Sequence, residues 1–213
     1  MIIDERLSCF ISSFDTPLPD YLSELQSFAI KTNVPIIRPQ MISLLRLLMV
    51  MNKPMNILEV GCAIGFSSLL MSHYAPKESH ITTIEKYEKR IPLAKENFKK
   101  AGKEGSITLL EGDATDILSE LDDEYDFIFM DAAKGQYINF LPDVLRLLKK
   151  NGILLSDNVL QDGDVIESRF AVRRRDRTIH KRMREYLYEL KHDPRLVTDI
   201  LPVGDGVTIS VKI

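Results

Sequence analysis

The chain has few cysteines and no long apolar run, and both absences narrow the class of protein. Its two cysteines, Cys9 and Cys62, lie far apart and lack the spacing of a metal site or a redox pair, which fits a reducing compartment. No apolar run approaches membrane-spanning length, and no basic stretch followed by an apolar core opens the chain. We therefore expect a cytoplasmic protein with no membrane association.

The sequence also lacks a strong net charge, repeats and low-complexity segments. A formal net charge of −3 argues against nonspecific nucleic-acid binding by the molecule as a whole, although it leaves room for a local basic patch. Hydrophobic residues at 45% and charged residues at 28% are ordinary for a globular protein. The length of 213 residues predicts a single domain over residues 1–213 with a substantial core.

Residues 1–52 contain no convincing strand. Apolar residues at helical spacing predict helices over Ile3–Phe14, Tyr21–Thr32 and Pro39–Met51. We interpret this block as a helical N-terminal extension of the same domain. It either covers the active site or carries a subunit interface, and most of its apolar side chains are expected in the core.

From Asn56 onward, strands and helices alternate, which predicts a parallel sheet with right-handed crossovers. Near-continuous apolar runs, typical of buried parallel strands, mark the centre of this region. The predicted strands are Asn56–Val60, His80–Glu85, Ser106–Leu110, Tyr125–Met130 and Gly152–Ser156. The predicted helices are Phe66–Tyr74, Glu88–Ala101, a short helix to Leu121, and Gln136–Lys150, which Asn151-Gly152 ends.

The C-terminal part departs from this alternation. We predict a loop-like insertion over Val159–Phe170, a long helix over Val172–Lys191, and two strands over Leu196–Val203 and Val207–Lys212. Gly204-Asp205-Gly206 joins these strands as a hairpin-type turn. The predicted fold is therefore α/β, a doubly wound, seven-stranded, mostly parallel sheet with an antiparallel C-terminal strand.

Polar residues follow two of the apolar strands. Asp131 ends the strand Tyr125–Met130, with Lys134 three residues later, and Asp157-Asn158 ends the strand Gly152–Ser156. Ligands of open parallel sheets bind off the carboxyl ends of the strands, so these groups should share one crevice. Carboxylate and amide oxygens suit Mg²⁺. The alternative is that Asp131 caps a helix and Asp157-Asn158 forms a turn.

A glycine-rich turn follows the first strand. Its pattern, Glu59-x-Gly61-x-x-x-Gly65, differs from the G-x-G-x-x-G of dinucleotide-binding folds and is similar to the first motif of class I S-adenosylmethionine (SAM) methyltransferases. Ser67 lies just after the turn. It either caps the next helix or bonds the methionine carboxylate of the cofactor.

Acidic residues at the ends of the next two strands strengthen this interpretation. Glu85 ends the second strand, where it could accept hydrogen bonds from two ribose hydroxyls, and Asp113-Ala114 follows the third, near a bound adenine. The alternative is that these residues are helix caps in a generic α/β protein.

Taken together, residues 35–213 resemble the cation-dependent O-methyltransferases related to catechol O-methyltransferase. The resemblance rests on Asp131-Ala-Ala-Lys134 and Asp157-Asn158. It implies a Rossmann-like class I fold, SAM as cofactor, Mg²⁺ (or Mn²⁺) held by Asp131, Asp157 and Asn158, and Lys134 as general base. It also implies that Met41 lies near the reactive methyl group, that Asp131 contributes to catalysis and cofactor binding, and that the protein is a homodimer.

A narrower set of motifs is similar to the bacterial tRNA 5-hydroxyuridine methyltransferases, which O-methylate a modified uridine at the anticodon wobble position. These motifs are Asp131-Ala-Ala-Lys-Gly-Gln-Tyr137, Asp157-Asn-Val-Leu160, Arg173-Arg174-Arg175 and Pro202-Val-Gly-Asp-Gly206. Asp-Ala-Ala-Lys also occurs widely among small-molecule enzymes. The resemblance implies the tRNA anticodon loop as partner.

An arginine-rich segment, residues 169–184, favours the RNA substrate. It contains eight Arg and Lys side chains and few acids, and arginine clusters contact phosphates. Tyr137, Phe140 and Phe170 are candidate stacking partners for splayed bases. The alternatives are a solvated helix face or a dimer contact for the basic run. The protein as a whole has two alternative functions: a small-molecule catechol or caffeoyl-CoA-like O-methyltransferase, or a noncatalytic SAM-binding module.

Overall fold

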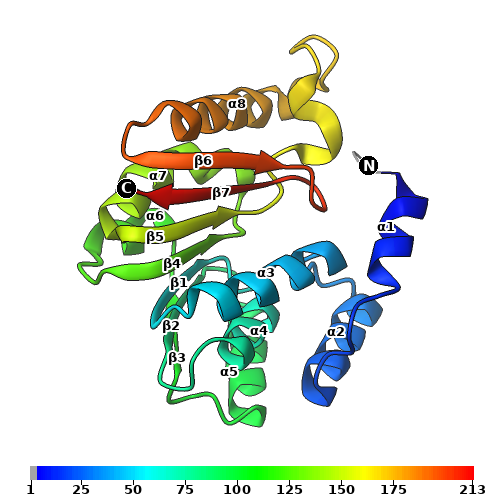
Figure 1. Ribbon diagram of the computed structural model, residues 1–213, viewed down its shortest axis with the longest axis vertical. Helices are drawn as coiled ribbons and strands as arrows, with labels where there is room; N and C mark the ends of the chain where they lie inside the picture. Colours follow the sequence, from blue (N-terminus) through cyan, green and yellow to red (C-terminus); the bar gives the residue numbers. More distant parts are fainter. Residues whose placement is uncertain (1–3) are drawn as a thin grey trace.

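A seven-stranded sheet forms the centre of the molecule in the computed structural model, which describes residues 4–213 (Figure 1). The strand order is β3-β2-β1-β4-β5-β7-β6, and β7 alone runs antiparallel to its neighbours. The predicted sheet and its antiparallel C-terminal strand are confirmed. The strands are β1 (Asn56–Val60), β2 (His80–Glu85), β3 (Ile107–Glu111), β4 (Tyr125–Met130), β5 (Leu148–Ser156), β6 (Leu196–Leu201) and β7 (Val207–Lys212).

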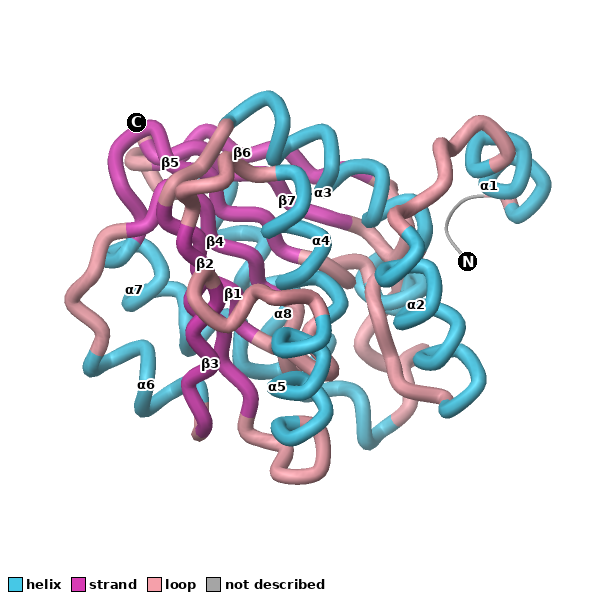
Figure 2. The backbone as a smooth tube through the Cα atoms, turned by 90° about the horizontal axis from the view of Figure 1, so that it is seen from below, coloured by secondary structure: helices cyan, strands magenta, loops and turns pink. Residues whose placement is uncertain are grey.

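Helices cover both faces of this sheet (Figures 1 and 2). One face packs against α2, α3, α4 and α5, and the other against α6, α7 and α8. The helices are α1 (Glu5–Ser12), α2 (Asp20–Thr32), α3 (Pro39–Asn52), α4 (Phe66–Tyr74), α5 (Ile91–Lys100), α6 (Ala114–Glu120), α7 (Tyr137–Leu147) and α8 (Arg177–His192). Short 3₁₀ turns occur at η1 (Lys134–Gln136), η2 (Gln161–Ile166) and η3 (Arg174–Asp176). The predicted start of the first helix, Ile3, lies outside the described residues.

The central strands are apolar throughout because both of their faces are buried. In β4, Phe127 and Phe129 pack on the α2–α5 side, whereas Ile128 and Met130 pack on the α6–α8 side. Successive side chains of a strand point to opposite faces, so a strand covered by helices on both sides needs apolar residues at every position.

The prediction that a helix continues to Lys150 is wrong. Helix α7 ends at Leu147, and β5 already begins at Leu148, which pairs with Tyr125. The Lys212 ammonium donates to the carbonyls of Leu145 and Leu148 at 2.7 and 2.6 Å. This long-range contact satisfies carbonyls that the helix end leaves free. Asn151-Gly152 therefore lies inside the strand, where Asn151 has a positive φ of 63°.

The prediction that a helix starts at Val172 is also wrong. Arg173 has extended backbone angles, η3 adds one tight turn, and α8 begins only at Arg177. The Arg177 guanidinium donates to the backbone carbonyls of Val172 and Phe170 at 3.2 and 3.4 Å. These bonds occupy carbonyls of the segment before the helix and hold it in a turn. The run Arg173-Arg174-Arg175 is consequently exposed and lies before α8, with Arg174 and Arg175 in the 3₁₀ turn η3.

The N-terminal extension is helical, as predicted, and α1 touches α3 at the edge of the molecule (Figure 1). Several apolar side chains of α1 and α3 are exposed, among them Phe10, Ile11 and Met51. A homodimer, which stays a prediction, would have this surface available for its interface. In residues 4–213, no helix combines the length and apolar character needed to cross a membrane.

One carboxyl group lies in the core. Glu59 on β1 is fully buried, and its Oε2 atom accepts hydrogen bonds from the hydroxyls of Ser68 and Thr83. Its Oε1 atom has no partner among the described residues. Burial disfavours the charged form and raises the pKa of Glu59 from 4.5 to about 7, although nearby hydroxyls lower it.

This burial predicts a pH-dependent stability. Because the pKa is higher in the folded state, the stability that Glu59 contributes is complete below pH 4.5 and is lost as pH rises through 7. The free energy of unfolding of Glu59→Gln should therefore rise relative to the wild type by about 3 kcal/mol between these pH values. Urea unfolding at several pH values measures this difference, and a constant difference would contradict it.

The turn after β1 packs directly against the end of β4. Gly61 has a φ of +107°, and a Cβ atom there would lie 2.1 Å from the carbonyl oxygen of Asp131. Only glycine combines this backbone conformation with so close an approach. The contact fixes the glycine-rich turn relative to Asp131.

We expect Gly61→Ala to lower the free energy of unfolding by more than about 3 kcal/mol, because strain and a backbone clash act together. Gly102→Ala is the matched control: Gly102 also has a positive φ, +63°, but a Cβ there meets no atom within 4 Å. Its cost should be about 1 kcal/mol from backbone strain alone. Equal losses in urea unfolding would mean that the close packing at Gly61 contributes nothing.

Candidate active site

A cavity of about 480 Å³ opens at the carboxyl ends of the parallel strands. This is the edge at which parallel α/β sheets bind ligands. Most of the predicted site residues line it: Gly61, Ser67, Glu85, Asp113, Ala114, Asp131, Asp157 and Asn158. Residues 35–38, which precede α3, form part of its wall, so the N-terminal extension does contribute to the site.

The end of β2 supports the glycine-rich turn. Glu85 Oε2 accepts a hydrogen bond from the backbone N–H of Ala63 at 2.7 Å, and its Oε1 accepts from Lys86 and Tyr87. These bonds fix the carboxylate at the cavity wall, and Oε2, which accepts a single bond, keeps a further lone pair for a ligand hydroxyl.

Asp113 caps α6 beside this wall. Its carboxylate accepts from the Thr115 backbone N–H at 2.9 Å and pairs with Lys86 at 3.1 Å. The bonds from Thr115, followed by that from Lys86, lower the pKa of Asp113. Asp113 is therefore a helix cap as well as a residue of the cavity wall, so the capping alternative and the binding role coexist.

Two of the predicted cofactor residues do not line the cavity. Met41 is buried in the core on α3, and Glu59 lies behind the glycine-rich turn. Their predicted roles toward the cofactor stay predictions. Ser67 does line the cavity, at the start of α4, and its hydroxyl lies close enough to Glu59 to lower the pKa of that carboxyl.

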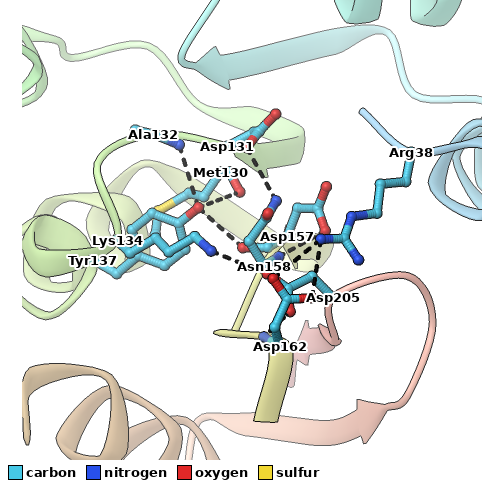
Figure 3. Close-up of polar contacts among 10 residues, drawn as sticks. All are labelled: Arg38, Met130, Asp131, Ala132, Lys134, Tyr137, Asp157, Asn158, Asp162 and Asp205. Carbon is cyan, nitrogen blue, oxygen red and sulfur yellow. Dashed lines mark hydrogen bonds and ion pairs between the residues drawn. The ribbon is translucent and has the colours of Figure 1, made fainter. Parts of the chain in front are cut away.

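The ends of β4 and β5 bring three oxygen-bearing side chains together (Figure 3). Met130 pairs with Ser156 across the two strands, so Asp131 and Asp157, the next residues, lie side by side. The Asn158 amide approaches Asp131 Oδ1 at 3.4 Å, and its backbone N–H donates to Asp157 Oδ1 at 2.6 Å. Asn158 has a positive φ of 63°, a conformation that asparagine tolerates better than most residues.

Burial raises the pKa of both carboxyl groups, and the charge of Asp131 adds to the shift of Asp157. Burial raises the pKa of Asp131 to about 6, with Lys134 opposing the shift. Burial, followed by the charge of Asp131, raises the pKa of Asp157 to about 7. Two adjacent buried carboxylates are costly when ionised, and a cation removes that cost. Two carboxylates and an amide oxygen match the hard ligands that Mg²⁺ prefers, so the donor set fits the predicted metal.

Lys134 pairs with a residue to which the sequence assigned no role. Its Nζ atom lies 3.0 Å from Oδ2 of Asp205, whose side chain is only 2% exposed (Figure 3). The lysine therefore does not pair with Asp131, the alternative that its place in the sequence suggested. The one signal that could have identified Asp205 is its position as the sole acid in the Gly204-Asp205-Gly206 turn.

Tyr137 is a second residue whose role depends on the fold. Its hydroxyl donates to the carbonyls of Met130 and Asp157 at 3.1 Å and accepts from the Ala132 N–H at 3.3 Å. It therefore ties the ends of β4 and β5 together. Because Tyr137 is completely buried, the prediction that it stacks on a base is wrong. Phe140 lines the cavity, and Phe170 is 85% exposed.

The arginine-rich segment divides into structural and exposed members. Arg182 and Arg184 donate to the carbonyls of Gly135 and Val165 at 3.0 and 2.9 Å. Arg173, Arg174 and Arg175 are exposed, and among residues 4–213 the one ion pair of these three arginines joins Arg175 to Asp176 at 3.5 Å. The contact between Arg182 and Gly135 joins α8 to η1, which carries Lys134. The exposed arginines thus precede a helix that packs beside the site.

Comparisons with known proteins agree with this geometry. A family model described as O-methyltransferase matches residues 11–213. Caffeoyl-CoA O-methyltransferase 2 of Populus trichocarpa is 33% identical over 172 residues, 74% of this chain and 67% of the relative. A catechol O-methyltransferase of Niastella koreensis is 33% identical over 135 residues, 62% of this chain and 61% of the relative.

Solved structures extend the similarity over nearly the whole chain. A methyltransferase of Podospora anserina, crystallised with SAH bound, superposes with a TM-score of 0.88 at 30% identity, over 98% of this chain and 94% of that one. The match of the family model over residues 11–213 and the relative that is 33% identical over 74% of the chain lead to one conclusion. The chain belongs to the O-methyltransferase family.

Proposed function

We propose that this protein transfers a methyl group from SAM to a hydroxyl whose neighbouring carbon carries a second oxygen. The observation that carries the proposal is that one cavity combines the glycine-rich turn and acidic strand ends with Asp131, Asp157 and Asn158. Membership of the O-methyltransferase family and the SAH-bound relative support it. The oxygen-bearing side chains alone, without a cofactor cavity beside them, would not support a methyl transfer from SAM.

The cofactor residues follow from the cavity wall. SAM supplies an electrophilic sulfonium methyl when bound. Gly61 lets the backbone approach the ligand closely, Glu85 accepts from the ribose hydroxyls, and Asp113-Ala114 borders the adenine. Ser67, which lines the cavity just after the turn, bonds the methionine carboxylate.

The metal and the base act on the acceptor. Mg²⁺ or Mn²⁺, held by Asp131, Asp157 and Asn158, lowers the pKa of an acceptor hydroxyl when bound. Lys134, whose side chain is 34% exposed, accepts the released proton at Nζ as a neutral amine and becomes the ammonium that pairs with Asp205. The cavity wall holds the acceptor oxygen in line with the methyl group, which makes the transfer effectively unimolecular.

The acceptor supported best is a catechol-type small molecule. Its vicinal hydroxyls are the two adjacent oxygens that chelation requires. The relatives at 32–34% identity include caffeoyl-CoA and catechol O-methyltransferases, and this agreement extends across enzymes from plants and bacteria.

A second acceptor, 5-hydroxyuridine at the tRNA wobble position, is favoured by one observation. Arg173, Arg174 and Arg175 are exposed, with one acid nearby, next to the helix that packs beside the lysine. Such a cluster suits phosphates of an anticodon loop. The 5-hydroxyl and 4-carbonyl of the base offer the same pair of adjacent oxygens as a catechol.

The metal set is tested by Asp157→Asn, which removes a charge with little change of shape. Because a neutral amide holds a divalent cation weakly, kcat should fall at least about 100-fold, while the Kd for SAM stays within about threefold of the wild type. Asp122→Asn, at a fully exposed position, is the control. Methyl transfer from labelled SAM and calorimetry give the two quantities. Full activity of Asp157→Asn would exclude the metal-assisted reaction.

The acceptor is tested with Arg173→Ala/Arg174→Ala/Arg175→Ala. If catechols are the substrates, kcat/KM for a catechol should stay within about twofold, because these exposed side chains lie outside the cavity wall. If tRNA is the substrate, kcat/KM for tRNA should fall at least about tenfold, with a weaker salt dependence.

The matched control replaces three exposed lysines of α2 and α5, Lys31, Lys99 and Lys100, and so removes the same charge elsewhere. Mass spectrometry of tRNA nucleosides from cells lacking the protein gives an independent answer. Unchanged 5-methoxyuridine would leave the catechol-type acceptor, whereas its loss with accumulation of 5-hydroxyuridine would identify tRNA.

A further inference from the structure

Three segments of the chain meet at the carboxylate of Asp205, beside the candidate active site (Figure 3). Asp205 lies in the turn between β6 and β7. Its Oδ2 atom accepts from Lys134 Nζ at 3.0 Å, and its Oδ1 atom accepts from the backbone N–H of Asp162 in η2. Each oxygen thus has its own donor, and the two donors come from different loops.

The turn that carries Asp205 is held rigidly. The backbone N–H groups of Val159 and Leu160 donate to the carbonyls of Gly206 and Asp205 at 2.9 and 3.0 Å. Gly206 has a φ of +82°, and a Cβ there would lie 2.2 Å from Leu160 Cγ. Because the turn is packed and bonded against the segment that follows β5, its carboxylate has a fixed position.

Lys134, by contrast, has little else to fix it. A lysine side chain has four rotatable bonds, and holding it in one conformation costs up to about 2 kcal/mol of entropy. Within residues 4–213, Asp205 is the acid with which Lys134 forms an ion pair. The charge of Lys134 also acts on Asp131 and Asp157, but neither of them forms an ion pair with it in the described residues, so the Asp205 carboxylate sets the direction of the ammonium.

We propose that Asp205 is a positioning residue that holds Lys134 Nζ at the edge of the Asp131 and Asp157 pair. The inference rests on the proposed function, in which Lys134 accepts the acceptor's proton. Asp205, like Lys134, is not among the residues that line the cavity; it reaches the site through its ion pair with Lys134, and its charge also raises the pKa of Asp157. A base must lie within hydrogen-bond reach of the proton it receives, and a fixed carboxylate provides that placement.

The neighbouring Asp162 provides a matched comparison. Its backbone N–H bonds Asp205, whereas its side chain pairs with Arg38 at 3.1 Å on the other side of the loop. Asp162 has a positive φ of 52°, which asparagine also tolerates. Asp162→Asn therefore removes a negative charge nearby but keeps the hydrogen bond to Asp205.

Asp205→Asn is the selective variant. Its amide oxygen can still accept from the Asp162 N–H, whereas its amide nitrogen then faces the Lys134 ammonium and cannot accept from it. We expect kcat to fall about 10- to 100-fold, with the KM for SAM within about twofold of the wild type. Asp162→Asn should keep kcat within about twofold, since Lys134 retains its partner.

A second measurement does not depend on turnover. Acetylation of Lys134 by an N-hydroxysuccinimide ester, followed by peptide mass spectrometry, reports how freely the amine reacts. In Asp205→Asn the labelling rate should rise at least about threefold, because the ion pair that holds the ammonium is gone. In Asp162→Asn it should stay unchanged. Equal labelling of Lys134 in the wild type and Asp205→Asn would overturn the proposal.

A double-mutant cycle separates positioning from a purely structural role. If Asp205 acts through Lys134, then Lys134→Met and Lys134→Met/Asp205→Asn should have equal kcat within about twofold. A further loss of about tenfold in the double variant would overturn the proposal. The comparison of Lys134→Met with the double variant can still be made if Asp205→Asn alone does not fold. The double variant removes both charges and so leaves neither one unpaired.

The same variants distinguish a failure of the proposed function from a failure of the positioning role of Asp205. Full activity of Lys134→Met would remove the base and, with it, any role for its positioning. Loss of activity in Lys134→Met with full kcat in Asp205→Asn would leave the function intact and overturn the positioning role alone.

Discussion

The in-register parallel pairing of β4 with β5 is the constraint on which the site depends. It places Asp131 beside Asp157 at the end of two buried strands. The strands hold the two carboxyl groups close together, so the charge of Asp131 raises the pKa of Asp157. The surrounding structure serves this arrangement. The turn at Gly61 packs against the Asp131 carbonyl, and the Tyr137 hydroxyl joins the two strand ends. A shift of register by one residue would turn one of these acids to the other face of the sheet.

The buried carboxyl groups in and beside the site lower the stability of the fold when they are ionised. Glu59, Asp131 and Asp157 all have raised pKa values because burial disfavours their charged forms. A generic α/β core would carry apolar residues at such positions. The cost becomes understandable if a divalent cation neutralises the two aspartates, because the same desolvation that penalises the empty pair strengthens its attraction to the ion.

The metal-binding set and the substrate-determining surface belong to different parts of the chain. Asp131, Asp157 and Asn158 would accept any acceptor with two adjacent oxygens, so they do not choose between a catechol and a 5-hydroxyuracil. Residues 35–38, which line the cavity, and the exposed Arg173, Arg174 and Arg175 before α8 lie outside the sheet, so such a choice would depend on them. Loops on a rigid scaffold can change in this way without disturbing the core.

The sequence by itself determined the order of strands and helices and the site residues that end each strand. Apolar runs of strand length, each followed by Gly61, Glu85, Asp113, Asp131 or Asp157, carry that information locally. The tertiary structure decided what depends on distant partners. Lys212 ends α7 earlier than its periodicity indicates, and Arg177 delays the start of α8. Asp205 meets Lys134 across 71 positions. No local pattern records such contacts, because they exist only once the sheet has brought its strand ends and loops together.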